Sequence, residues 1–163
     1  MFVQDGEEQL FSFRYIYMND TQKKDALKLD NQLCFPLYVC SKEVVRRYKP
    51  YLDELDLTYT QYITMMAMWE HKSLNVSALG DYLYLDSGTL TPLLKKLEQK
   101  GYVVRKRSEE DERSLIVTIT PAGEELKKKA ADIPQRIGKC FEISPEDSGE
   151  LYRILHKLMA TWK

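Results

Sequence analysis

Residues 84–120 read YLDSGTLTPLLKKLEQKGYVVRKRSEEDERSLIVTIT, and the spacing of their apolar residues changes at Gly101. Before this glycine, four leucines between residues 90 and 97 recur at the i, i+3, i+4, i+7 interval of an amphipathic helix. After it, residues 102–107 and 113–120 alternate with a period of two, as strands do, across a charged turn. This stretch therefore predicts a helix followed by a two-stranded hairpin.

Helical periodicity also runs through the rest of the chain, and in the helix after Thr58 it predicts that Tyr62, Met65, Met66 and Trp69 face the core. Capping residues support several of these helices, among them Thr120 followed by Pro121 and Ser144 followed by Pro145. We expect helices over residues 30–51, from Thr58 onward, over 76–83, 87–100 and 121–139, where Pro134 can introduce a kink, and from Ser144 onward. Two short helices in close succession, a hairpin and longer flanking helices predict a mainly α fold with a small β-hairpin, which is a winged helix-turn-helix with added helices at both termini.

Composition limits the classes of function. The chain has 163 residues, of which 44% are hydrophobic and 30% charged, as expected for one compact domain. Its 24 Lys and Arg against 25 Asp and Glu give a net charge of −1, so any nucleic-acid binding must come from a local basic patch. Three cysteines are too few for a secreted disulfide scaffold and indicate a reducing, cytoplasmic compartment. We find neither a membrane-length apolar run nor a signal peptide.

Short hydroxyl side chains and basic residues gather where such a fold would meet DNA. The helix that begins at Ser87 would lie in a major groove, with its hydroxyl groups near the positive end of the helix dipole. The hairpin would reach a minor groove, where Asp111 could hold Arg113 in an extended position. The candidate DNA-binding residues are Ser87, Thr89, Thr91, Lys95, Lys96, Arg105, Lys106, Arg107, Asp111 and Arg113. The charged run alone is more typical of a solvated turn, and it is the order of the elements that favours DNA binding.

The three cysteines occupy different settings. Cys40 falls on the apolar stripe of its predicted helix and is expected to be a buried, unreactive side chain. Six residues of helix place it about 9 Å from Cys34, beyond disulfide reach. Cys34 lies in the first turns of the helix, whose dipole favours a thiolate, and the hydroxyl of Tyr38 at i+4 could donate to the sulfur. A buried, inert thiol is the alternative. Tyr48 lies about 21 Å further along, so it could meet Cys34 only across an antiparallel partner helix.

The remaining residues indicate no further chemistry. His71 and His156 are isolated and form no metal-ligand spacing, so we expect no metal. Nor do we find a glycine-rich phosphate loop, and we expect no cofactor. The first 17 residues carry aromatic side chains at no helical period, and we expect a flexible leader over residues 1–25, with Met18 as an alternative start.

Four motifs resemble the OhrR branch of the MarR family, which consists of dimeric winged-helix repressors that sense organic hydroperoxides. They are LDNQLCFPLY at residues 29–38, RYKP at 47–50, YLDSGTLTPLLKKLE at 84–98 and RKRSEEDERS at 105–114. The resemblance covers residues 26–161 in the correct order. It implies a homodimer in which residues 58–120 form the DNA-binding domain, while residues 26–57 and 121–163 form a helical dimerisation region.

The resemblance also implies roles for single residues. Cys34 matches the peroxidatic sensor, and Tyr38 and Tyr48 match the tyrosines that hydrogen-bond it across the dimer. Ser87, Thr89 and Lys96 fall at recognition-helix positions that contact DNA, and Asp111 and Arg113 match the pair at the wing. Cys140 lies near the position of a resolving thiol in the two-cysteine subtype. Pro36, two residues after Cys34, departs from the pattern and could kink the helix.

The function implied is a redox-sensing repressor that is not an enzyme. Its reduced form binds a pseudo-palindromic double-stranded operator and releases it when an organic hydroperoxide oxidises Cys34. A MarR-type repressor released by a small phenolic ligand is one alternative. A thiol peroxidase is another, although no Arg or His adjoins Cys34 in the sequence to activate it.

Overall fold

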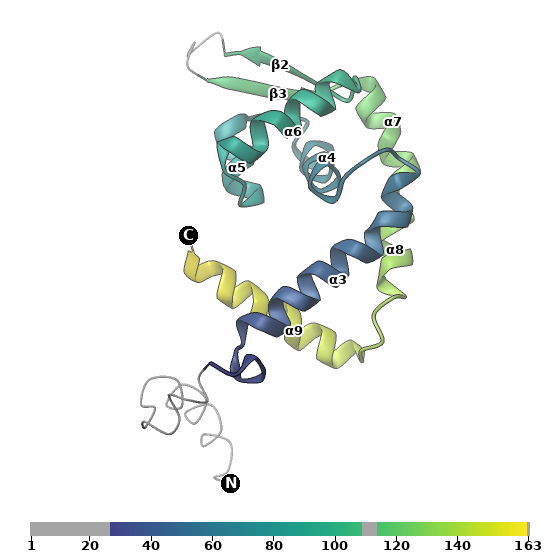
Figure 1. Ribbon diagram of the computed structural model, residues 1–163. Helices are drawn as coiled ribbons and strands as arrows, with labels where there is room; N and C mark the ends of the chain where they lie inside the picture. The colour runs from purple at the N-terminus through teal and green to yellow at the C-terminus, as the bar shows by residue number, and fades with distance from the viewer. Residues whose placement is uncertain (1–26, 109–113, 163) are drawn as a thin grey trace. The chain divides into compact units, whose positions relative to one another are not determined.

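The computed structural model describes residues 27–108 and 114–162 (Figure 1). The chain divides into two compact units, residues 1–46 and 47–163, and each is described by itself. The predicted leader over residues 1–25 and the wing residues Asp111 and Arg113 lie outside the described residues.

The predicted helices and hairpin are present. The helical elements are η1 (Leu29–Asn31), α3 (Cys34–Asp53), α4 (Tyr59–His71), α5 (Val76–Leu83), α6 (Ser87–Gln99), α7 (Pro121–Ala130), α8 (Ile133–Gly138), α9 (Pro145–Met159) and η2 (Ala160–Trp162). The strands are β1 (Ser73–Asn75), β2 (Val103–Arg107) and β3 (Leu115–Ile119). Thr120 and Ser144 cap α7 and α9 as predicted, because each side-chain oxygen accepts from the backbone N–H three residues on.

Prolines set two helix boundaries differently from the prediction. The helix expected over residues 121–139 is two helices, and Pro134 lies in the first turn of α8 rather than at a kink. Pro36 likewise lies in the first turn of α3, where its missing N–H would have had no partner within the helix. The helix expected from Asp30 begins at Cys34, because residues 29–31 form a separate 3-10 turn.

The sheet contains a strand that the sequence did not indicate. Its order is β1-β3-β2, and both neighbours of β3 are antiparallel to it. Leu74 of β1 lies opposite Val117, and Arg105 of β2 lies opposite the same residue on the other edge. Three residues are too few to show a period of two, and β1 exists because β3 offers a second edge for pairing.

The core of the 47–163 unit lies between α4, α5, α6 and the sheet. The four leucines of α6 are buried, as predicted, together with Val103 and Val117 of the hairpin. Met65 of α4 is fully buried, but Met66 is 45% exposed, so the prediction that both point to the core is wrong. Successive helical residues are about 100° apart, and Met66 falls on the outer face.

Hydrogen bonds at the base of the hairpin link α4 to α7 and hold the ends of the two hairpin strands together. The indole N–H of Trp69 donates to the carbonyl of Gly123 at 2.8 Å, and this bond is buried. The N–H of Thr120 donates to the carbonyl of Tyr102 at 3.0 Å, and the Thr120 hydroxyl donates to the carbonyl of Gly101 at 2.6 Å. The base of the hairpin is therefore held on both strands.

The apolar stripes of α3 and α9 are both partly exposed in the single chain. No described residue from 27 to 46 is buried, and Cys40 is exposed, so the prediction that Cys40 is a core side chain is wrong. The apolar stripe of α9 is uncovered as well, with Leu151 and Ile154 each 48% exposed. Periodicity predicts an apolar face on each of these helices, but it does not say what covers that face. Within the described ranges, no helix has the length and apolar character needed to cross a membrane.

Candidate nucleic-acid interface and cysteine site

The N-terminus of α6 presents its hydroxyl side chains to solvent. Asp86 caps the helix by accepting from the Thr89 N–H at 2.8 Å and from the Thr89 hydroxyl at 3.1 Å. These hydrogen bonds, that from the Thr89 N–H first, hold the pKa of Asp86 below its usual value. The buried leucines on the opposite side fix the rotation of the helix. The predicted residues Ser87, Thr89, Thr91, Lys95 and Lys96 are all exposed on the same helix.

The hairpin carries exposed basic side chains beyond its base. Lys106 and Arg107 are both exposed at the far end of β2. The N–H of Ser108 donates to the Ser114 carbonyl at 2.8 Å, so pairing reaches the last described residues on either side of residues 109–113. Figure 1 shows β2 and β3 side by side, next to α6.

Arg105 is arranged differently from its basic neighbours. Its guanidinium donates to one oxygen of Glu98, from Nη2 at 2.6 Å and from Nε at 3.1 Å. Only 17% of the Arg105 side chain is exposed. The hydrogen bonds from Arg105 hold the pKa of Glu98 below its usual value. Sequence reasoning missed Glu98, and its seven-residue separation from Arg105 across a turn gives no periodic signal.

Cys34 is the first residue of α3 and is exposed. Tyr38 follows one turn later with 61% of its surface exposed. The ammonium group of Lys42 lies 6.0 Å from the Tyr38 ring centroid, a contact that the i+4 spacing could have suggested. The N-terminal turns of α3 thus present a thiol, a phenol and a cation, each four residues after the one before.

Tyr48 belongs to a cluster of aromatic side chains near the other end of α3. Its ring centroid lies 5.0 Å from that of Tyr59 and 5.8 Å from that of Tyr62. Burial is the main cause that raises the pKa of Tyr62 to about 12, and it also raises the pKa of Tyr48 and of Tyr59. These tyrosines stay protonated at neutral pH and are available as hydrogen-bond donors.

The third cysteine and the described cavity lie apart from Cys34 in the sequence. Cys140 follows α8, is half-buried, and directs its sulfur toward the Arg136 carbonyl at 3.5 Å.

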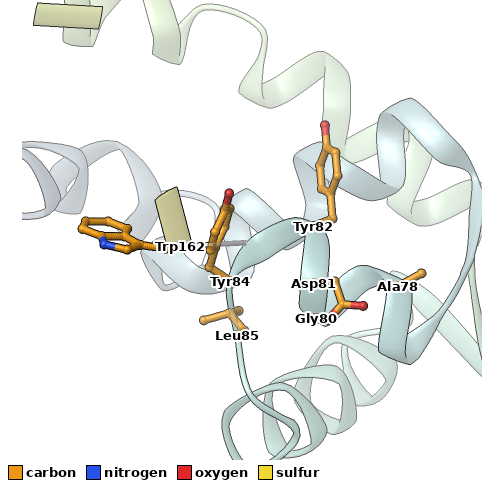
Figure 2. Close-up of a pocket in the computed structure, with 7 residues that line it drawn as sticks. All are labelled: Ala78, Gly80, Asp81, Tyr82, Tyr84, Leu85 and Trp162. Atoms are coloured by element: carbon orange, nitrogen blue, oxygen red, sulfur yellow. The ribbon is translucent and has the colours of Figure 1, made fainter. Parts of the chain in front are cut away.

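A shallow cavity of about 630 Å³ is lined by residues of α5 and the following turn together with Trp162 (Figure 2). Its lining contains neither a cysteine nor a basic side chain. Among the described residues, no group of three His, Cys, Asp or Glu side chains could hold a metal ion.

The pair α5 and α6, followed by a basic β2–β3 hairpin and packed on α4, is the architecture of the winged-helix DNA-binding regulators. Residues 46–133 match the family model described as transcriptional regulator SarA/Rot. The chain belongs to this family of MarR-type winged-helix transcriptional regulators. Members of the family are transcriptional regulators rather than enzymes.

Three relatives illustrate the similarity. The organic hydroperoxide resistance transcriptional regulator of Bacillus subtilis is 51% identical over 139 residues, which cover 85% of this chain and 95% of that protein. The HTH-type transcriptional regulator SarZ of Staphylococcus aureus is 46% identical, covering 81% and 89% of the two chains. The structure of reduced AbfR bound to DNA, from Staphylococcus epidermidis, matches with a TM-score of 0.73 and 33% identity, covering 86% and 96%.

Proposed function

We propose that this chain is a cytoplasmic, homodimeric repressor that binds a pseudo-palindromic operator when reduced and releases it when an organic hydroperoxide oxidises Cys34. The observation that carries the proposal is the exposed thiol of Cys34 at the start of α3, with Tyr38 one turn away, in a chain 51% identical to an organic hydroperoxide resistance regulator.

The chemical step begins with the Cys34 thiolate. Its sulfur attacks one oxygen of the hydroperoxide, an S–O bond forms and the O–O bond breaks. The alkoxide that leaves takes a proton and departs as the alcohol, while the cysteine becomes a sulfenic acid. The positive end of α3 favours the thiolate, and the Tyr38 hydroxyl is available to donate to the sulfur.

A second thiol completes the response. The thiol of Cys140 from the partner subunit, or a small thiol, condenses with the sulfenic acid to give a disulfide and water. Tyr48 of the partner is the second candidate donor to Cys34, since fourteen residues of one helix separate the two positions within a chain. Loss of the thiolate contacts would alter the helices that set the spacing of the two DNA-reading helices.

The DNA contacts are assigned to α6 and the wing. Ser87, Thr89 and Thr91 meet base edges and phosphates in the major groove, and Lys95 and Lys96 add charge one turn further. Lys106, Arg107, Asp111 and Arg113 serve the wing. The dimerisation region comprises residues 26–57 and 121–163, and the uncovered apolar stripe of α9 supports this division.

The test is an operator-release assay with a matched cysteine control. A duplex selected from random sequence by the reduced protein is titrated with parent, Cys34→Ser and Cys40→Ser, before and after cumene hydroperoxide. Both cysteines are exposed on α3, so the control reports on oxidation of an ordinary thiol in the same helix. We expect the peroxide to release the parent and Cys40→Ser but not Cys34→Ser. Release of Cys34→Ser at the parental peroxide concentration would refute the sensor assignment.

A separate measurement addresses Cys140. After oxidation, non-reducing electrophoresis should show a crosslinked dimer for the parent and only monomer for Cys140→Ser. A monomer band alone for the parent would assign resolution to a small thiol, and intact mass would then identify that adduct on Cys34.

A further inference from the structure

Arg105 and Glu98 join the first strand of the hairpin to the last turns of α6. Glu98 receives three hydrogen bonds from this one residue, two from the guanidinium and one from the backbone N–H at 3.0 Å. The carboxylate therefore holds the main chain of β2 as well as the side chain that leaves it. Both partners are largely covered, with side-chain exposures of 17% for Arg105 and 35% for Glu98.

This arrangement is unfavourable for direct DNA binding by Arg105. Two of its guanidinium nitrogens, Nη2 and Nε, already donate to one oxygen of Glu98, so this edge of the group is not available to a phosphate. To meet DNA it would have to leave Glu98, and an unpaired carboxylate would then remain beside the phosphates. The two charges also cancel, so the pair adds nothing to the basic field of the wing.

Lys106, the next residue of β2, differs from Arg105 in its exposure. Lys106 is exposed and belongs to the opposite face of β2, because successive strand residues point to opposite sides. The two cations are neighbours on one strand, yet one is committed to α6 and the other faces solvent.

We propose that Arg105 is a positioning residue rather than a DNA contact. Through Glu98 it holds β2 at a fixed angle to α6, so that the recognition helix and the wing engage neighbouring grooves at the same time. The inference rests on the proposed use of α6 and the wing on DNA, but it does not depend on the redox response.

The test is a double-mutant cycle on reduced protein, read as affinity for the selected duplex. Glu98→Ala removes a negative charge, so a directly binding Arg105, once freed, would make this variant bind more tightly than the parent. A positioning role predicts the opposite sign: Glu98→Ala and Arg105→Ala each bind about tenfold more weakly, and the double variant lies within about twofold of either.

Two further variants keep the outcome interpretable. Arg105→Lys retains the charge for a phosphate but loses the paired Nε and Nη2 donors that hold the Glu98 oxygen, so we expect it to bind about as weakly as Arg105→Ala. In Lys106→Ala, by contrast, the slope of log K against log salt should become shallower by about 0.9 per subunit. The fold-loss in affinity caused by Lys106→Ala should multiply with the fold-loss caused by Glu98→Ala when the two substitutions are combined. Circular dichroism verifies folding of every variant.

Footprinting adds a readout that overall affinity does not supply. Arg105→Ala should lose hydroxyl-radical protection in the flanking minor grooves and keep methylation protection in the major grooves. Tighter binding by Glu98→Ala, or parental affinity of Arg105→Lys, would overturn the positioning role. Failure of the parent to select any duplex would instead refute the proposed DNA interface.

Discussion

Gly123 offers a sharp test of how the hairpin is attached to α7. A Cβ at this position would lie 2.3 Å from the carbonyl oxygen of Tyr102 and 2.7 Å from Cγ1 of Ile119. The obstructing oxygen belongs to the backbone and accepts the Thr120 N–H, so it cannot turn aside as a side chain would. Gly123→Ala must therefore separate α7 from the base of the hairpin.

The magnitude follows from two opposing effects. Overpacking of a closed contact costs typically about 1–3 kcal/mol, occasionally more, and a backbone obstacle places this site at the upper end of that range. Alanine in place of glycine in a helix returns about 1 kcal/mol. The Gly123 carbonyl also accepts from Trp69, and this buried bond would be disturbed by the same shift. We expect a net loss of about 2 kcal/mol in the free energy of unfolding, combining these ranges.

Urea unfolding at one fixed protein concentration measures this loss, because a dimer's stability depends on concentration. With a slope of about 2 kcal/mol per molar urea, the midpoint should fall by about 1 M. Gly149→Ala is the matched control, because a Cβ at that position of α9 meets nothing within 4 Å and should be neutral or stabilising. A midpoint for Gly123→Ala equal to or above that of the parent would refute the reasoning.

Three further predictions concern stability in the 47–163 unit. Leu94→Ala removes a fully buried side chain of α6 and should lower the free energy of unfolding by about 2–5 kcal/mol in urea; a loss below about 1 kcal/mol would contradict its place in the core. Thr58→Ala removes the hydroxyl that accepts from the Gln61 N–H, while the backbone N–H of residue 58 can still donate to the Gln61 side chain. The loss of this half of the capping box should cost about 1 kcal/mol, whereas an unchanged urea midpoint would mean that the cap is unimportant. The pKa of Tyr62 is raised to about 12 by burial, so its contribution to stability is fully present below pH 10 and is lost as the pH rises through 12. Tyr62→Phe should therefore flatten the fall in stability over that interval, and an unaltered profile would assign the fall to other groups.

Local periodicity and capping were sufficient to predict most of the elements. The leucine stripe of α6, the caps at Thr120 and Ser144 and the two strands of the hairpin each depend on residues close in sequence. Such patterns determine backbone conformation and the apolar face without reference to distant residues. The short strand β1 was missed because its only signal is the free edge of β3, far along the chain.

Burial was less predictable than conformation. Cys40 lies on an apolar stripe, but it is exposed because the described residues around it do not cover that part of α3. Met66 was assigned to the core with its neighbour Met65, although one residue of helix turns it outward. Sequence pattern identifies which face is apolar, whereas only the packed structure shows whether another element covers it.

By itself, the sequence determined the winged-helix order of elements, the position of Cys34 at the start of a helix and the hydroxyl and basic residues of α6. Only the tertiary structure decided which basic side chains are exposed and therefore available to bind DNA. It pairs Arg105 with Glu98 and leaves Lys106 exposed, though the two cations are adjacent in the sequence. The physical reason is that an ion pair forms between side chains that the fold brings within about 3 Å, and the turn between α6 and β2 creates that proximity.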